Sequence, residues 1–196
     1  MKELSEKARF ARYESGFLWL KDAGVAIPTY NVEAPRIPLL LNKQRNLFKL
    51  FLNDVGLLAA MYGGDIQVRL LSSLNVNYGA AFENLVVQEL YAHGFAIDHD
   101  LFYFNSKKQG ELDFVVEYQG EVLPIEVKSG KAYERHRALS NIMDNEEYAI
   151  PNAIVFCQEN IQIKNRLVYL PIYMLMFLQH EQNNDLTYQF DLTGLK

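Results

Sequence analysis

The sequence ELDFVVEYQGEVLPIEVKSG, residues 111–130, contains two apolar-rich segments separated by a Gln-Gly pair. β-Branched and aromatic residues on both sides of such a pair predict two antiparallel strands joined by a two-residue turn at 119–120. In this register Tyr118 faces Glu121, and each step away from the turn pairs the next residue on either side. The stretch therefore predicts a hairpin whose register can be counted from the turn.

Counting back from the turn places Asp113 opposite Glu126 and Glu111 opposite Lys128. Because side chains alternate along a strand, these four charged residues are expected on one face of the hairpin. The other face is apolar and is expected to pack on the core. Its residues are Leu112, Phe114, Val116, Ile125 and Val127.

Two carboxylates that oppose each other across a strand pair repel, which costs stability unless a positive group lies between them. A divalent cation is one answer, and carboxylate oxygens suit Mg²⁺ or Mn²⁺, which can polarise a phosphoryl oxygen and activate a water. Lys128 would then stand beside that water or the phosphate. The alternative is a surface salt-bridge cluster without metal, in which Lys128 neutralises Glu126 and Glu111.

A helix is predicted over residues 78–93, with Asn77 as its N-cap and Gly94 as its left-handed C-terminal residue. Glu83 shares one face of this helix with an apolar stripe. The stripe consists of Val86, Val87 and Leu90. Since an unpaired buried carboxylate is costly, Glu83 either points toward a polar site or lies at the edge of the stripe in solvent.

Periodicity and turn residues predict the remaining elements. Before the central helix we expect a helix over 5–22, mostly extended chain over 25–48, a strand at 49–52, and a helix capped by Asn53-Asp54. After it we expect strands at 101–105, 153–157 and 167–170, a helix around 133–147, and a closing helix after Pro171. These elements form an N-terminal helical and extended appendage over 1–76, an α/β core over 77–180, and a polar tail over 181–196.

Composition limits the classes of function. With 49% hydrophobic residues, 12 Phe and 12 Tyr, the chain has enough apolar material to fold. A net charge of −5 at pH 7 argues against tight non-specific binding to nucleic acid, which depends on Lys and Arg. Local basic patches are expected instead. The candidates are Lys43 with Arg45, Lys107 with Lys108, and Arg135 with His136 and Arg137.

The sequence also indicates a cytoplasmic protein that is not associated with a membrane. The charged N-terminus lacks a signal-peptide stretch, and the longest hydrophobic run, LVYLPIYMLMFL, is too short to span a bilayer. The single cysteine, Cys157, cannot form an internal disulfide and is expected to be buried. No G-x-x-x-x-G-K-[ST] loop is present, so we expect no nucleotide site and no ATPase activity in this chain.

The order of the helix with Glu83, a strand, ELDFVV, a turn and PIEVKSG resembles the PD-(D/E)xK restriction-endonuclease-like fold over about residues 78–157. More narrowly, KLFLNDVGLLAAMYG, YGAAFENLVVQEL, ELDFVV and PIEVKSG resemble a domain of unknown function. This domain follows the ATPase module of bacterial and archaeal AAA-type ATPases. The resemblance covers the chain from about residue 17, and it implies that the helix at 5–22 ends a segment connecting to such a module.

The resemblance implies an α/β core built as a helix, a three-stranded antiparallel or mixed sheet, a helix and a strand. It implies Asp113 and Glu126 as metal ligands, Lys128 as the catalytic lysine and Glu83 as an accessory acid, with Glu111 as an auxiliary residue. The implied activity is divalent-metal-dependent phosphodiester hydrolysis of nucleic acid. The alternative is a non-catalytic accessory domain that binds an ATPase partner or dimerises.

Overall fold

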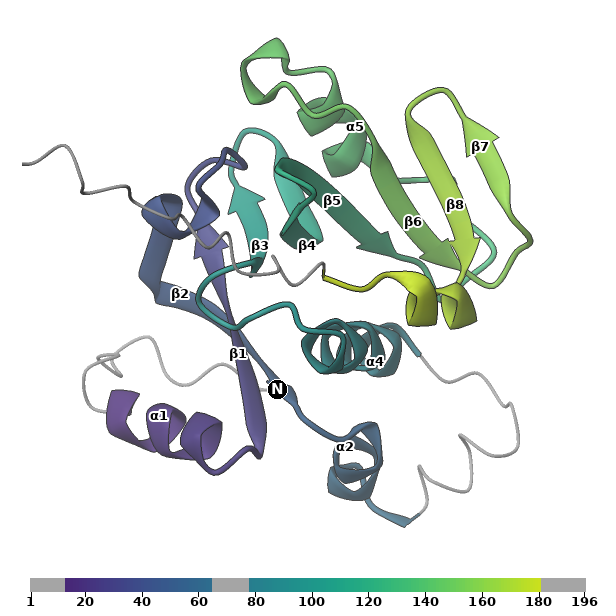
Figure 1. Cartoon of the computed structure of the whole chain (residues 1–196). Helices are drawn as coiled ribbons and strands as arrows, with labels where there is room; N and C mark the ends of the chain where they lie inside the picture. Colours follow the sequence, from purple (N-terminus) through teal and green to yellow (C-terminus); the bar gives the residue numbers. More distant parts are fainter. Residues whose placement is uncertain (1–12, 65–77, 181–196) are drawn as a thin grey trace, which may run out of the picture.

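The computed structural model describes residues 13–64 and 78–180, which contain an eight-stranded mixed sheet flanked by helices (Figure 1). The strand order is β2-β1-β3-β4-β5-β6-β8-β7. The strands are β1 (Ala26–Val32), β2 (Lys43–Leu52), β3 (Leu101–Ser106), β4 (Gly110–Tyr118), β5 (Glu121–Val127), β6 (Ala153–Cys157), β7 (Gln162–Lys164) and β8 (Leu167–Pro171). The helices are α1 (Glu14–Asp22), α2 (Val55–Met61), α4 (Gly79–Ala92) and α5 (Arg137–Met143), with 3-10 turns η2 (Leu39–Asn42), η3 (Glu146–Tyr148) and η4 (Ile172–Phe177).

The predicted α/β class is confirmed, but the sheet is larger than the three strands expected. On one side, β1 pairs in parallel with β3, and β2 pairs antiparallel with β1. On the other side, β6 and β8 add in parallel, and β7 closes the edge as an antiparallel strand. All seven residues of β1 are buried, and the segment forms an inner strand although it contains Pro28.

The hairpin between β4 and β5 has the predicted register from Tyr118↔Glu121 to Phe114↔Ile125. Gln119 and Gly120 have φ values of 52° and 78°. Positive φ at both central residues is the backbone of the two-residue turn that matches strand twist. The local prediction from the Gln-Gly pair is therefore confirmed.

The apolar face of the hairpin packs on the core as predicted, but the opposite face is buried as well, and Leu112 leaves the other residues of its face. A register shift between β3 and β4 places an extra β4 residue between the Phe102↔Val115 and Phe104↔Leu112 pairs. Such a bulge interrupts side-chain alternation. Leu112 consequently joins the core cluster that contains α5, whereas Phe114 joins the cluster that contains α4.

The helix termini follow local signals. Helix α4 ends at Ala92, and Gly94 has the predicted left-handed conformation with φ 95°. The Asp54 side chain accepts hydrogen bonds from the backbone N–H groups of Gly56 and Leu57, as expected for the N-cap of α2. The predicted N-cap Asn77, residues 5–12 of the first predicted helix, the 76/77 boundary and the tail over 181–196 lie outside the described residues.

Two predicted helices differ in length or type. The helix expected over 133–147 is limited to α5, because Asn145 instead caps the following turn η3 by accepting from the Glu147 N–H. The closing helix is the 3-10 turn η4. The expected burial of Cys157 is confirmed, and its thiol is free. Within residues 13–64 and 78–180, no helix has both the length and the apolar character needed to cross a membrane.

Candidate functional site

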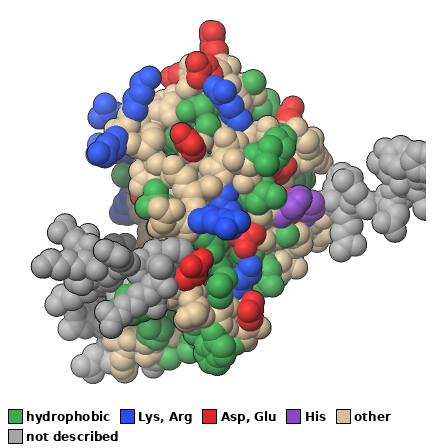
Figure 2. Space-filling view, turned by 90° about the vertical axis from the view of Figure 1, so that its left-hand side faces the viewer, with side chains coloured by type: hydrophobic (Ala, Val, Ile, Leu, Met, Phe, Trp, Pro, Cys, Tyr) green, Lys and Arg blue, Asp and Glu red, His purple; other side chains and the backbone are tan. Residues whose placement is uncertain are grey.

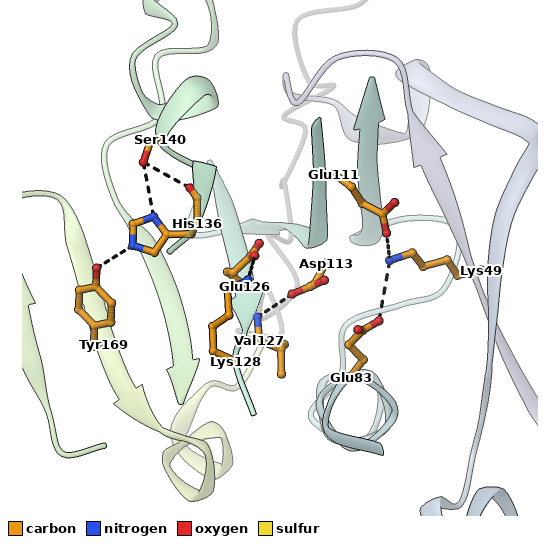
Figure 3. Close-up of polar contacts among 10 residues, drawn as sticks. All are labelled: Lys49, Glu83, Glu111, Asp113, Glu126, Val127, Lys128, His136, Ser140 and Tyr169. Carbon is orange, nitrogen blue, oxygen red and sulfur yellow. Dashed lines mark hydrogen bonds and ion pairs between the residues drawn. The ribbon is translucent and has the colours of Figure 1, made fainter. Parts of the chain in front are cut away.

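Strands β2, β4 and β5 and helix α4 bring acidic and basic side chains together on one part of the sheet (Figure 3). Strand β4 carries Glu111 and Asp113, and the end of β5 carries Glu126 with Lys128 directly beyond it. Helix α4 supplies Glu83. The five residues that the sequence singles out therefore lie around one site.

Asp113 lies where the β4–β5 ladder ends. The last ladder pair is Phe114↔Ile125, and the Val127 N–H donates to Oδ2 of Asp113 at 2.7 Å. A side-chain carboxylate thus takes the place of a backbone acceptor at this end of the hairpin. Burial raises the pKa of Asp113, although the Val127 N–H and the nearby lysines act in the opposite direction.

Glu126 is the most buried acid of the site, with 6% of its surface exposed. Its Oε1 lies 2.6 Å from Nζ of Lys128, whereas its Oε2 is buried and has no hydrogen-bond partner within the described part of the chain. Burial, followed by the charge of Asp113, raises the pKa of Glu126 to about 7. An unpartnered carboxylate oxygen in this position is energetically unfavourable unless a proton or a cation reaches it.

A second lysine, Lys49 of β2, holds the other two acids. Its Nζ lies 2.5 Å from Oε1 of Glu111 and 3.9 Å from Oε2 of Glu83. Burial, followed by the charge of Asp113, raises the pKa of Glu83 to about 6. Of the two positions considered for Glu83, the structure thus shows the one that faces a polar site (Figure 3).

The pairing of charges differs from the expected one. The register suggested a pair between Glu111 and Lys128, but Lys128 pairs with Glu126 and Glu111 pairs with Lys49. The bulge and the early end of the ladder explain the difference, because the simple hairpin count fails beyond Phe114. Sequence reasoning missed Lys49, whose only local signal is a basic residue within the strand KLFL.

A histidine lies on the other side of Lys128 (Figure 3). His136 shares a hydrogen bond of 2.7 Å between its Nε2 and the Tyr169 hydroxyl, and its Nδ1 lies 3.4 Å from Oγ of Ser140. Burial and the positive charge of Lys128 lower the pKa of His136. The lowered pKa favours the neutral form of this imidazole, whose place beside the site the spacing of the histidines in the sequence did not indicate.

The donor set is compatible with a hard divalent cation, although the side chains do not enclose one as they stand. Within the described ranges, no three His, Cys, Asp or Glu side chains gather closely enough to hold a metal ion. The buried, unpartnered Oε2 of Glu126 and the neighbouring carboxylate of Asp113 provide oxygen ligands of the type that Mg²⁺ and Mn²⁺ prefer. Mg²⁺ commonly binds through one or two carboxylates and keeps several waters.

The predicted basic patches differ in their availability. Lys43 pairs with Asp98 at 2.6 Å and lies over the Tyr30 ring. Lys107 and Lys108, at the turn between β3 and β4, are exposed. On the face shown in Figure 2, Lys and Arg side chains lie among Asp and Glu side chains.

Comparisons with known proteins give relatives without an assigned function. The chain is 33% identical over 86 residues to an uncharacterized protein of Mycobacterium tuberculosis and to one of Mycobacterium bovis. The aligned part is 44% of this chain and 19% of each relative, so the chain matches only a small part of their length. No solved structure matches the chain.

The family comparison covers the part of the chain that contains most of the site. Residues 78–175 match the family described as a domain of unknown function, DUF4143. This region includes Glu83, Asp113, Glu126 and Lys128, whereas Lys49 lies before it. The matched region is half of the chain, and the chain belongs to the DUF4143 family.

Proposed function

We propose that this chain carries a divalent-metal-dependent phosphodiesterase site in a PD-(D/E)xK nuclease-like core, and that it acts on nucleic acid. The observation that carries the proposal is the buried, unpartnered Oε2 of Glu126 beside Asp113, with Lys128 at the same carboxylate. The order of elements supports it: α4 with Glu83, strand β3, the β4–β5 hairpin, and the parallel strand β6.

Asp113 and Glu126 would hold Mg²⁺ or Mn²⁺, and the bound ion would polarise a phosphoryl oxygen and lower the pKa of a coordinated water. The remaining chemistry comes from the chain itself. Glu126 holds the Lys128 ammonium, whose side chain is 27% exposed, at the edge of the site. From there Lys128 can donate hydrogen bonds to a phosphate oxygen that gains charge during hydrolysis. Glu83 and Glu111 would support the site through Lys49.

A second candidate is a non-catalytic accessory domain that binds an ATPase partner or a second copy of the chain. The ion pairs favour it, since Lys128 and Lys49 already neutralise part of the acidic charge without a metal. The likeness to the domain that follows the ATPase module of AAA-type ATPases supports it as well. This candidate predicts partner binding or dimerisation, and no cleavage of nucleic acid.

A cleavage panel tests the two candidates. Wild-type protein, Lys128→Ala and the control Lys108→Ala would be incubated with single-stranded, double-stranded and structured DNA and RNA, with Mg²⁺, Mn²⁺ or EDTA. Lys108 is a suitable control because it is exposed and lies on the β3–β4 turn. The proposal predicts metal-dependent cleavage by wild type and by Lys108→Ala, and its loss in Lys128→Ala. Equal cleavage by all three proteins, or none by wild type, contradicts a nuclease function.

A further inference from the structure

Lys49 reaches the acidic site from strand β2, outside the region that matches the family. Its Nζ contacts Glu111 at 2.5 Å and Glu83 at 3.9 Å, and only 23% of its side chain is exposed. Strand β2 fixes this position through its ladder with β1, in which Lys49 pairs with Thr29. The ammonium is therefore part of the site rather than a solvated surface charge.

The two lysines divide the four carboxylates into separate groups. Lys49 holds Glu83 and Glu111, and Lys128 holds one oxygen of Glu126. Asp113 accepts from a backbone N–H and has no ion pair with a lysine among the described residues. When all six groups are ionised, the four carboxylates carry four negative charges and the two lysines carry two positive charges, so the site has a net charge of −2. One divalent cation would balance that charge, whereas a second would make the site positive.

We infer that Lys49 is a positioning residue that acts as a built-in cation: it holds Glu83 and Glu111 where a second metal ion would otherwise bind, and limits the site to one divalent cation. The inference rests on the proposed function for the ion at Asp113 and Glu126. Its physical basis is repulsion, because an ammonium within hydrogen-bond distance of Glu111 opposes the approach of another cation to the same oxygens.

Counting bound Mn²⁺ tests the inference. Free Mn²⁺ would be measured by electron paramagnetic resonance during titration of metal-free wild type, Lys49→Met, Lys49→Gln and Lys49→Arg. Wild type and Lys49→Arg are expected to bind one ion. The two neutral variants are expected to bind a second ion more weakly, because Glu83 and Glu111 then face each other without a cation. The triple variant Lys49→Met/Glu83→Gln/Glu111→Gln should return to one ion.

Circular dichroism shows which variants keep the fold. Lys49→Gln is included because its amide can still donate to Glu111, so it keeps the inference testable if Lys49→Met unfolds. The inference is overturned if a folded neutral variant binds the same number of ions as wild type, or if the second ion persists in the triple variant. Binding of one ion by Lys49→Arg, as by wild type, shows that the limit depends on the positive charge at position 49 and not on a purely structural role of the lysine.

The same titration separates this inference from the proposed function. If wild type binds no Mn²⁺, the metal site at Asp113 and Glu126 fails. The limit of one ion set by Lys49 then fails with it, because the inference rests on that metal site. If wild type binds one ion and Lys49→Met does the same, the proposed function stands and the role of Lys49 fails.

Discussion

The ammonium of Lys128 lies 2.6 Å from Oε1 of Glu126, two residues earlier in the chain. A metal ion bound at this carboxylate would compete with the lysine for it. We therefore predict that Lys128→Ala lowers the cleavage rate by about 10² or more, since a donor to developing phosphate charge is lost. The same variant should bind Mn²⁺ at least as tightly as wild type. Rate assays and calorimetry on one preparation check both effects, and weaker Mn²⁺ binding by the variant contradicts this description of the pair.

The raised pKa of Glu126 predicts a pH-dependent stability. Burial and Asp113 raise it from an ordinary value of 4.5 to about 7, so folding favours the protonated acid. Stability should therefore be highest at low pH within this range, fall as pH rises from about 4.5 to about 7, and change little above it. The upper bound of the loss from this group is about 3 kcal/mol. Urea unfolding in EDTA at several pH values measures it.

Glu126→Gln provides the control for this pH dependence. The neutral amide removes the titration and the repulsion of Asp113, so the variant should gain stability relative to wild type as pH rises from 5 to 8. Saturating Mn²⁺ should stabilise wild type more than Glu126→Gln, because a ligand that binds only the folded state raises its stability. If the stabilities of the two proteins in EDTA change in parallel with pH, the raised pKa of Glu126 is contradicted.

Asn84 connects helix α4, which carries Glu83, to strand β2, which carries Lys49. We predict that it stabilises the packing of these two elements. It is 2% exposed, its Nδ2 donates to the Leu52 carbonyl at 2.8 Å, and its Oδ1 accepts from the Leu52 N–H at 2.8 Å. Asn84→Ala should cost about 2–4 kcal/mol, because both backbone groups of Leu52 lose their partner. The stability of Asn84→Asp should lie between that of wild type and that of Asn84→Ala, since its carboxylate can accept from the Leu52 N–H but cannot donate to the Leu52 carbonyl. A cost below about 0.5 kcal/mol for Asn84→Ala argues against this role.

Gly110 occupies a backbone position that a side chain should not tolerate. Its φ is 97°, and an added Cβ would lie 3.0 Å from Cβ of Ala138 on α5. Gly110→Ala should therefore cost more than the roughly 1–2 kcal/mol expected from the left-handed conformation by itself. Gly120→Ala is the matched control, because φ is 78° there and no atom lies within 4 Å of the added Cβ. Thermal unfolding should show the larger loss for Gly110→Ala, with partial recovery in Gly110→Ala/Ala138→Gly.

Sequence predicts this fold best where neighbouring residues decide the structure. The turn at 119–120, the left-handed Gly94 and the Asp54 cap depend on a few adjacent residues, and all three are confirmed. The breadth of the sheet depends on pairing between β1 and β3, which are distant in the chain. Nothing in the sequence of residues 26–32 reveals that pairing, so the sheet was expected to have fewer strands than it has.

The site shows the same division. Hairpin counting places Asp113 opposite Glu126; in the structure both lie next to the last ladder pair, Phe114↔Ile125, but the ladder does not pair them with each other. The partners of Lys128 and Glu111 depend instead on a bulge against β3 and on Lys49 from β2. These are contacts between distant segments, and the alternation rule for one hairpin cannot supply them.

Calorimetric titration of the metal-free protein with Mg²⁺ and Mn²⁺ tests the metal site at Asp113 and Glu126 most directly. Asp113→Asn and Glu126→Gln are the variants, since each keeps side-chain shape and removes one negative charge, and Glu134→Gln on the exposed surface is the control. We predict that wild type and Glu134→Gln bind one divalent ion, and that Asp113→Asn and Glu126→Gln bind it at least tenfold more weakly. Absence of binding to folded wild type, or equal binding by all four proteins, contradicts a metal site at these two residues.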